Sequence, residues 1–334
     1  MRPIRNRFAK LLIYLGLAVY VVSTAMPFVW TLLQSLKTVR DANSAVPLFI
    51  FEPTLESYAK LWLLETPENL SLILFGILVA SLTVFFLAIF LSRHGAPQFI
   101  VVGVVVGGFA LILWTIPQLM KMADWYDFFT NTVIITTCAV TISISLSATA
   151  GYAIARKRGV SGAILLVVAL GLGSLPPMAF AMPYYQLSAM LQIQDSFILV
   201  IAVMVGLQQP FSIWMLRGFF MEIPRDIDES AMIDGASRLR AFWSVVMPIS
   251  WPGVVAVAIL NVLGVYHNFL IIRVLTILRW TLAVGITKYV GSIYAATDTV
   301  PFAAAVSASL PLLILVFFFQ DQLVKGLGAG AVKG

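Results

Sequence analysis

The sequence IPRDIDESAMIDGASRLRAFWSVVMPISWPG, residues 223–253, carries seven charged side chains between two long apolar runs. Only 11% of the 334 residues are charged, 60% are hydrophobic, and the mean hydropathy is +0.98. A soluble domain has about 45–50% apolar and about 25% charged residues. The composition therefore predicts an integral membrane protein in which the quoted stretch is a loop. It excludes soluble enzymes, nucleic-acid binders and disordered scaffolds.

Outward from this loop, the apolar runs are long enough to cross a membrane. About twenty apolar residues span the roughly 30 Å hydrocarbon core of a bilayer. Eight runs meet this length, and none of them contains Asp, Glu, Lys or Arg. The expected spans lie near residues 11–34, 69–92, 99–119, 130–155, 162–183, 196–216, 249–272 and 301–320. The predicted fold class is all-α, a polytopic membrane helix bundle of about eight transmembrane helices.

The distribution of charge predicts the orientation of these spans. Cytoplasmic loops carry an excess of Lys and Arg. With the basic N-terminus inside, fourteen basic residues fall on the cytoplasmic side and seven outside, against six and nine acidic residues. We therefore expect a multi-pass protein with both termini and the 223–253 loop in the cytoplasm. The net charge of +6 then reflects membrane topology rather than an acidic ligand.

Within the loop, the residue pattern predicts two short helices joined by a turn. Asp226 precedes Glu229 by three residues, the spacing of a capping box, and predicts a helix over about 227–233. Gly235 favours a break after that helix, and Ser237 is a residue type that caps the next one. An ordinary amphipathic loop lying on the membrane would explain the same pattern equally well.

The loop also resembles a known signature. The loop contains Glu229-Ser230-Ala231, then three residues, Gly235, nine residues and Val245-Val246-Met247-Pro248. This pattern resembles the EAA signature of ABC importer permeases, which reads E-A-A, three residues, G, nine residues, I-x-L-P. The substitutions of Ser for Ala, Val for Ile and Met for Leu are conservative. Sequence around the loop, over about 125–334, resembles the carbohydrate-type branch of this family, the second permease of the maltose-importer kind.

This resemblance implies a type I ABC importer permease fold, with a coupling helix in the loop 218–250. It implies one half of a heterodimeric pathway for a sugar or polyol in the bacterial cytoplasmic (inner) membrane. The partners implied are a second permease subunit, a cytoplasmic ABC ATPase dimer that uses ATP and Mg, and an extracytoplasmic substrate-binding protein. The residues implied to couple the chain to the ATPase are Glu229, Ser230, Ala231, Asp234, Gly235, Ala236 and Pro248. The C-terminal tail 328–334 is expected to reach the ATPase as well.

The chain is not expected to be an enzyme, and we expect no catalytic residue, bound cofactor or metal. No lysine follows a glycine in a GxxxxGK[ST] loop, so the P-loop route of ATP hydrolysis is absent from this sequence. No carboxylate or histidine chain lies at mid-membrane, which argues against an ion-coupled carrier. A stand-alone secondary carrier for a neutral solute and a structural membrane subunit are the alternative functions.

Two features depart from the family pattern. Where the family commonly has Trp-Asn-Glu/Asp, this chain has Tyr266, His267 and Asn268, which are candidate pore-lining residues or amphipathic residues at the membrane interface. The hydrophobic pair 69–119 adds two spans, so we divide the chain into an N-terminal section, 1–124, and a core transmembrane domain, 125–334. Gly103 and Gly107 in this pair have GxxxG spacing, which permits close helix packing but is common in membrane helices. The sequence does not select a particular sugar or polyol.

Overall fold

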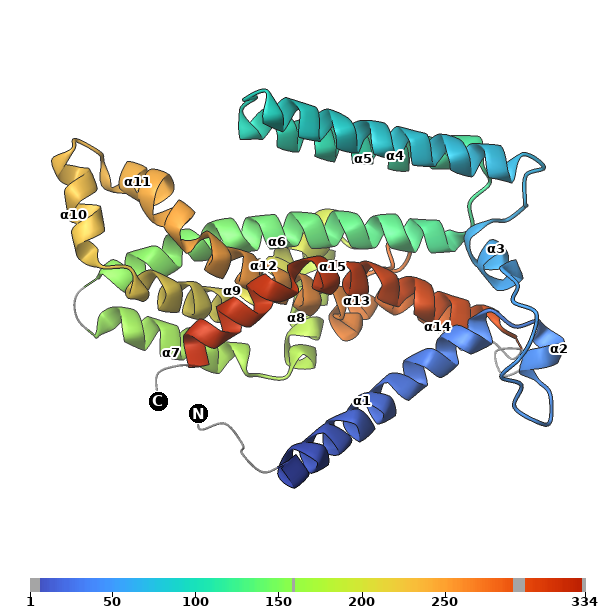
Figure 1. The fold of residues 1–334 in the computed structure, drawn as a ribbon. Helices are drawn as coiled ribbons and strands as arrows, with labels where there is room; N and C mark the ends of the chain where they lie inside the picture. Colours follow the sequence, from blue (N-terminus) through green and yellow to red (C-terminus); the bar gives the residue numbers. More distant parts are fainter. Residues whose placement is uncertain (1–6, 158–159, 291–297, 332–334) are drawn as a thin grey trace. The chain divides into compact units, whose positions relative to one another are not determined.

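A computed structural model describes residues 7–157, 160–290 and 298–331. Regular structure within these ranges is helical, and the β-type pairing found there is one isolated bridge between Leu63 and Met122. The predicted all-α fold is confirmed. The chain divides into two compact units, Met1–Tyr126 with Lys288–Ser307, and Asp127–Thr287 with Ala308–Gly334, which are described separately (Figure 1).

The first unit contains two long helices that pack as a hairpin. Its helices are α1 (Arg7–Ser35), α2 (Val39–Ala42), α3 (Glu56–Trp62), α4 (Leu70–Arg93) and α5 (Gln98–Leu119). Gly95, at φ +74°, allows the turn between α4 and α5. The close approach is made at Gly108, where an added Cβ would lie 2.6 Å from Val84 Cγ2, whereas Gly103 and Gly107 have nothing within 4 Å. The GxxxG pair therefore does not form the helix contact within this chain.

Residues distant in sequence complete the first unit. The Ser57 Oγ and Thr299 Oγ1 atoms share a buried hydrogen bond of 2.6 Å. The Trp62 Nε1 atom donates to Ser307 Oγ at 3.3 Å. These bonds hold the beginning of α15 (Val300–Ala331) against α3.

The second unit is built around three long helices whose buried side chains form two apolar clusters. Its helices before the charged loop are α6 (Asp124–Arg156), α7 (Ser161–Gly173), α8 (Pro177–Met190) and α9 (Phe197–Glu222). Its remaining elements are α10 (Arg225–Ile233), α11 (Arg238–Ala241), a π-helical turn (Phe242–Val246), α12 (Met247–Tyr266), α13 (Phe269–Leu275) and α14 (Leu282–Val290), followed by α15. Figure 1 shows α6, α9 and α12 running along one another.

Seven helices in the described ranges are long and apolar enough to cross a membrane, and one bent pair raises the number to eight. The prediction of about eight spans is confirmed in number, but the span at 162–183 is not straight. Its two parts, Ile164–Gly173 and Pro177–Met190, meet at 87°. Pro176 and Pro177 cause the break because proline lacks the N–H of the helical ladder and disfavours helical geometry in the residue before it. The predicted span 249–272 also ends earlier, at Tyr266, and α13 follows separately.

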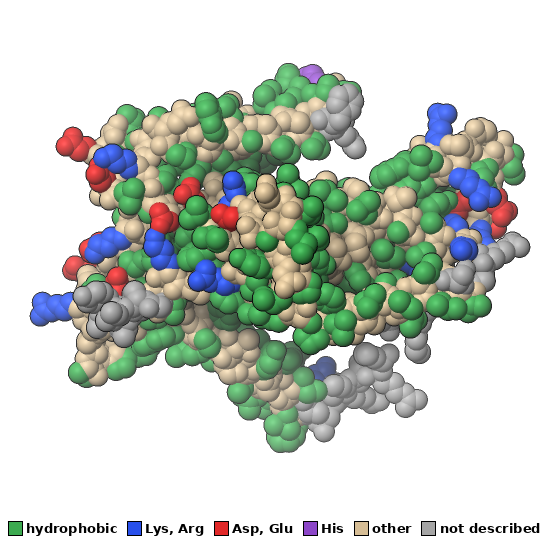
Figure 2. Space-filling view, turned by 180° about the vertical axis from the view of Figure 1, so that it is seen from behind, with side chains coloured by type: hydrophobic (Ala, Val, Ile, Leu, Met, Phe, Trp, Pro, Cys, Tyr) green, Lys and Arg blue, Asp and Glu red, His purple; other side chains and the backbone are tan. Residues whose placement is uncertain are grey.

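The surface agrees with a membrane environment. In Figure 2 hydrophobic side chains are spread over the helices, and Lys, Arg, Asp and Glu gather both on the left and on the right, where α10 and α11 lie. Many large apolar side chains on α4 are exposed, and those of Leu72 and Phe75 are 67% and 63% exposed. An apolar helix surface of this kind is expected where lipid is the surrounding medium.

Gly253 on α12 gives a test of the helix packing. A Cβ added there would lie 2.6–2.8 Å from three ring carbons of Phe219 on α9. Overpacking of this kind costs about 1–3 kcal/mol, so Gly253→Ala should lower the midpoint of thermal unfolding in detergent by several degrees. Gly218→Ala is the matched control, since a Cβ at Gly218 meets nothing within 4 Å. Equal midpoints for the two variants would contradict the α9–α12 packing.

Candidate functional site

The charged loop folds into a helix–turn–helix elbow, which we define as residues 224–241. It comprises α10, the turn at residues 234–237, and α11, whose chain continues through the π turn into α12. The interpretation of two short helices is confirmed. α10 begins two residues earlier than expected and ends at Ile233.

The predicted capping box at the start of α10 is wrong. The N-cap residue is Pro224, and no side chain forms a capping hydrogen bond there. Because the helix already begins at Arg225, Asp226 has helical geometry and cannot serve as the non-helical cap. Asp226 and Asp228 lie in the first turn instead, where negative charge interacts favourably with the helix dipole.

The turn of the elbow depends on Gly235. Its φ is +87°, a conformation that side chains other than glycine rarely adopt. The Ala236 N–H donates to Ala231 O at 3.0 Å and the Gly235 N–H donates to Met232 O at 3.1 Å, which closes the C-terminus of α10. Ser237 then caps α11 by accepting from the Arg240 N–H at 3.3 Å. The predicted roles of Gly235 and Ser237 in the local fold are confirmed.

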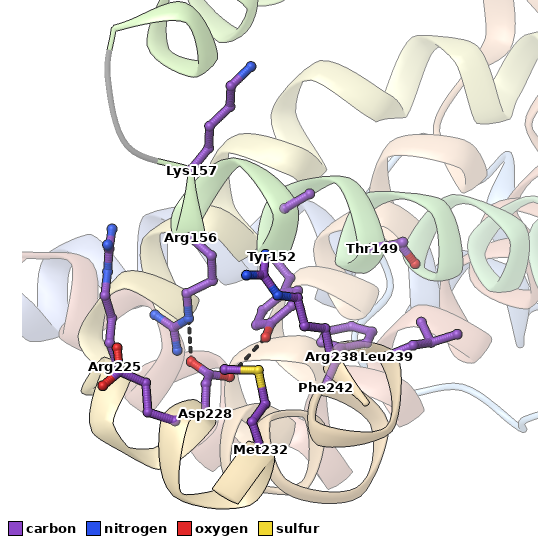
Figure 3. Close-up of a pocket in the computed structure, with 12 residues that line it drawn as sticks. Thr149, Tyr152, Arg156, Lys157, Arg225, Asp228, Met232, Arg238, Leu239 and Phe242 are labelled. Carbon is purple, nitrogen blue, oxygen red and sulfur yellow. Dashed lines mark hydrogen bonds and ion pairs between the residues drawn. The ribbon is translucent and has the colours of Figure 1, made fainter. Parts of the chain in front are cut away.

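A buried ion pair fastens the elbow to α6. The Asp228 Oδ2 atom lies 2.6 Å from Arg156 Nε, and the two side chains are 8% and 16% exposed. The Tyr152 hydroxyl donates to Asp228 Oδ1 at 2.9 Å. Both interactions are drawn as dashed lines in Figure 3, where Asp228 points toward Arg156 and Tyr152. α10 is thus held by its first turn to the end of α6.

Arg156 also holds the end of α9. Its Nη1 atom donates to the carbonyl oxygens of Phe220 and Ile223 at 2.9 and 3.1 Å. The last carbonyls of a helix lack intrahelical partners, and a guanidinium both satisfies them and suits the negative end of the helix dipole. One side chain therefore connects α6, the C-terminus of α9 and the first turn of α10.

Aromatic packing reinforces the same junction. The ring of Tyr152 lies 4.7 Å from that of Phe242 and 6.0 Å from that of Phe220, measured between centroids. Phe220 and Phe242 are 5.9 Å apart and are nearly fully buried. Offset and edge-on aromatic contacts of this kind stabilise a core by about 0.5–1.5 kcal/mol per pair beyond the area that they bury. We call Tyr152, Arg156, Phe220, Asp228 and Phe242 the elbow anchor.

Beside the elbow anchor lies an open cavity of about 760 Å³ between the elbow and the end of α6. Its wall holds four basic residues and two acidic ones, Arg156, Lys157, Arg225, Arg238, Asp228 and Glu229. Lys157 and Arg225 extend away from Asp228 in Figure 3, so Arg156 is the cation that pairs with it. Within the described residues no cluster of three His, Cys, Asp or Glu side chains could hold a metal ion.

The structure leaves most of the predicted coupling residues exposed on the elbow. Glu229, Ser230, Asp234 and Gly235 are exposed, and Ala231 and Ala236 are half-buried. Ile233 at the tip is 86% exposed and Leu239 on α11 is 62% exposed. The elbow therefore exposes small and apolar side chains beside charged ones, among them the carboxylates of Glu229 and Asp234.

Pro248 lies apart from the elbow, in the first turn of α12, and is exposed. Its ring cannot donate to the carbonyl four residues earlier, and a regular helix would be strained there. The π turn immediately before it relieves this mismatch, with the Met247 N–H bonded to Phe242 O, five residues back. The proline of the signature thus coincides with the irregular junction between elbow and span.

The candidate pore-lining residues are at the end of α12. Tyr266 is buried, and its hydroxyl donates to Ala308 O at 2.6 Å. His267 is exposed, with Nδ1 at 3.1 Å from Leu263 O, and Asn268 is half-buried. Tyr266 is thus engaged within the chain, and the pore-lining role of the three residues stays a prediction.

Sequence reasoning missed the elbow anchor. Asp228 reads as one of several solvent-facing acids in a polar loop, and Arg156 as one of three basic residues at the end of a span. The available signal was helical spacing, because Asp228 lies one turn before Ala231 and Met232, which are half-buried. A charge at a position of the apolar face indicates a buried partner, but the sequence does not identify which basic residue it is.

The family model for the "binding-protein-dependent transport system inner membrane component" matches residues 143–328, which is more than half of the chain and includes the elbow. The maltodextrin transport system permease protein MdxG of Bacillus subtilis is 29% identical over 226 residues, covering 66% of this chain and 81% of that protein. The sulfoquinovosyl glycerol transport system permease protein SmoH of Agrobacterium fabrum is 33% identical over 210 residues, covering 62% and 73%.

A solved structure is similar over nearly the whole length. A chain of a bacterial ABC transporter involved in the import of the acidic polysaccharide alginate aligns with a TM-score of 0.68 and 14% identity. The alignment covers 96% of this chain and 98% of that one. This likeness supports the fold of the chain, including its long apolar helices.

Proposed function

Because the chain belongs to the family of binding-protein-dependent transport system inner membrane components, whose relatives here are sugar ABC transporter permeases, we propose that it forms half of a translocation pathway for a sugar or related polyol. The elbow is the part that contacts a separate cytoplasmic ATPase. The observation that carries this proposal is the exposed surface around Ile233 and Gly235, held to the spans by the elbow anchor.

The elbow anchor suggests how motion of the ATPase reaches the membrane. Nucleotide binding would close the ATPase dimer and displace the elbow docked on it. Since Asp228 pairs with Arg156, and Arg156 bonds the end of α9, displacement of α10 would act on α6 and α9 together. Rigid coupling of this kind supports a rocking of the two permease halves between inward-open and outward-open states.

The remaining partners follow from the same proposal. A second permease subunit would complete the pathway, and an extracytoplasmic substrate-binding protein would deliver the solute. The segment 273–300 is proposed to face that binding protein, although residues 291–297 lie outside the described ranges. The last three residues of the tail, 332–334, lie outside them too. The orientation with both termini and the elbow in the cytoplasm follows the positive-inside rule.

Reconstitution tests this proposal against a stand-alone carrier. The chain would be purified with the permease, ATPase and binding protein encoded beside it, and uptake of maltodextrin and trehalose would be measured in liposomes with and without ATP. We expect the ATPase to co-purify, and uptake to require both ATP and the binding protein. Uptake by the chain alone, without any ATPase, would support the carrier instead. Assembly with no uptake under any condition would support a structural subunit.

A further inference from the structure

A buried polar network joins α6, α9 and α12 near the middle of the bundle. Ser143, Ser212 and Asn261 are fully buried. The Ser212 hydroxyl donates to Asn261 Oδ1 at 2.8 Å, and Gln209 Nε2 donates to Ser143 Oγ at 3.3 Å. Such side chains satisfy one another and hold membrane helices together. The network therefore accounts for its own polar groups and needs no ligand.

Gln208, the neighbour of this network, is different. Its side chain is half-buried, and its Nε2 atom donates to the backbone carbonyl of Asn261 at 3.1 Å. The Oε1 atom has no hydrogen-bond partner among the residues that the structure describes, and it is not enclosed by protein. Gln208 is the twelfth residue of the 26-residue α9, so this amide oxygen lies near the middle of a membrane-spanning helix.

Gly264 on α12 makes room for the amide. A Cβ added to Gly264 would lie 2.3 Å from Gln208 Nε2 and 3.1 Å from both Cδ and Oε1. The amide of Gln208 thus occupies the space that a side chain at Gly264 would fill, and Gly264 itself is exposed. His267 is three residues further along and shares this face of α12, where it is also exposed. The α9–α12 surface therefore presents the amide of Gln208 near the middle of α9, and the His267 ring directly after the last residue of α12.

An amide oxygen without a partner is costly in hydrocarbon. Each unsatisfied polar group there costs several kcal/mol, whereas one that faces a water-filled cavity or a polar ligand costs little. The placement of Gln208 over a glycine therefore indicates that this face meets water or a polar solute rather than lipid tails. A neutral amide that both donates and accepts matches hydroxyl groups and carries no charge for an ionic ligand.

We propose that Gln208 lies on the wall of the translocation pathway and hydrogen-bonds hydroxyl groups of the passing solute, with Gly264 leaving the space that its amide occupies. This proposal rests on the proposed function and adds the residue and the chemistry of one contact. The solute class is a neutral, hydroxyl-rich molecule. His267, on the same face, extends the polar surface toward the end of α12.

Thiol labelling in the assembled complex tests the placement without knowledge of the solute. Gln208→Cys is made in a Cys138→Ser background, because Cys138 is the single cysteine and is exposed. The probe is a charged, water-soluble methanethiosulfonate. A thiol in contact with water forms the reactive thiolate and one in lipid does not, so Gln208→Cys should react about tenfold faster than Val167→Cys. Val167 is the matched lipid-facing control, 68% exposed on α7. The labelling rate of Gln208→Cys should also change when vanadate traps the ATPase.

A second experiment tests whether Gly264 leaves the space that the Gln208 amide occupies. Gly264→Ala should displace Gln208 and lower the maximal rate of maltodextrin or trehalose uptake about tenfold, as Gln208→Leu should, because one hydrogen bond to the solute is worth about 1.4 kcal/mol. Gly206→Ala is the control: it lies two residues before Gln208, on the opposite side of α9, and a Cβ there meets nothing within 4 Å.

The outcomes separate the two proposals. If Gln208→Cys reacts no faster than Val167→Cys in a complex that transports, the inference is overturned and the proposed function stands. If Gln208→Leu prevents assembly with the second permease, Gln208 is an interface residue and the inference is overturned as well. If the wild-type complex shows no ATP-driven uptake, the proposed function fails, whereas rapid labelling would still support a water-facing Gln208.

Discussion

A complex carrying Glu229→Lys or Gly235→Asp should lose most of its ATP-driven uptake while the chain still assembles in the membrane. Glu229 is an exposed carboxylate of α10 on the wall of the open cavity, so the lysine reverses the charge that a docking partner meets there. A reversed charge at a protein interface costs several kcal/mol, which corresponds to a loss of about a hundredfold or more. The measurement is initial uptake together with ATPase activity in liposomes.

Gly235→Asp acts at the turn of the elbow. A Cβ at Gly235 would meet nothing within 4 Å in this chain, so the substitution causes no clash there. It adds strain at φ +87° and places a charged side chain at the tip that the partner would contact. ATP hydrolysis should continue without uptake, or the ATPase should dissociate from the permease during purification.

Matched controls separate docking from folding. Gly95→Asp introduces the same residue at another glycine of positive φ, +74°, again with nothing within 4 Å, in the turn between α4 and α5. Glu222→Lys reverses an exposed charge at the end of α9, outside the elbow. Both controls should transport at nearly the wild-type rate. Uptake near wild type in Glu229→Lys and Gly235→Asp would contradict the coupling role of the elbow.

Removing the buried carboxylate of the elbow anchor should have the second large effect. Asp228→Ala leaves Arg156 largely enclosed without its counter-charge, and breaking a buried pair in this way costs about 3–5 kcal/mol. Because α10 is then no longer held to α6, we expect ATP hydrolysis that is poorly coupled to uptake. The unfolding midpoint in detergent should fall as well.

A double-mutant cycle measures the interaction directly. Asp228→Ala, Arg156→Ala and the double variant should give a coupling free energy of about 1–3 kcal/mol. The exposed pair of Lys60 with Glu56, whose side chains are 54% and 58% exposed, is the control and should give below about 1 kcal/mol. If the losses at Asp228 and Arg156 simply add, the two side chains do not act as one anchor.

The sequence predicted the parts of this fold that depend on local chemistry. Long apolar runs without charge located the spans, because such runs have few alternatives to crossing a bilayer. Gly235 and Ser237 marked the turn and second cap of the elbow because their conformational preferences are intrinsic to the residue type. The family signature located the elbow itself.

Features that depend on contacts between distant segments could not be predicted. The buried pair of Asp228 with Arg156 joins two segments whose charges each read as solvated. The close approach of the Gln208 amide to Gly264 likewise requires α9 and α12 to lie side by side. The capping box failed for a different reason: Pro224 starts α10 before Asp226, and spacing alone does not say which residue begins the helix.

Photo-crosslinking from the tip of the elbow tests the central claim most directly. Ile233→Cys, in the Cys138→Ser background, would carry a benzophenone maleimide, since Ile233 is 86% exposed. Ile50→Cys, 95% exposed in a loop predicted to lie on the opposite side of the membrane, is the control. We predict that the adduct from Ile233→Cys contains the ATPase subunit and the adduct from Ile50→Cys does not. An Ile233→Cys chain that transports normally but never crosslinks to the ATPase would contradict the account.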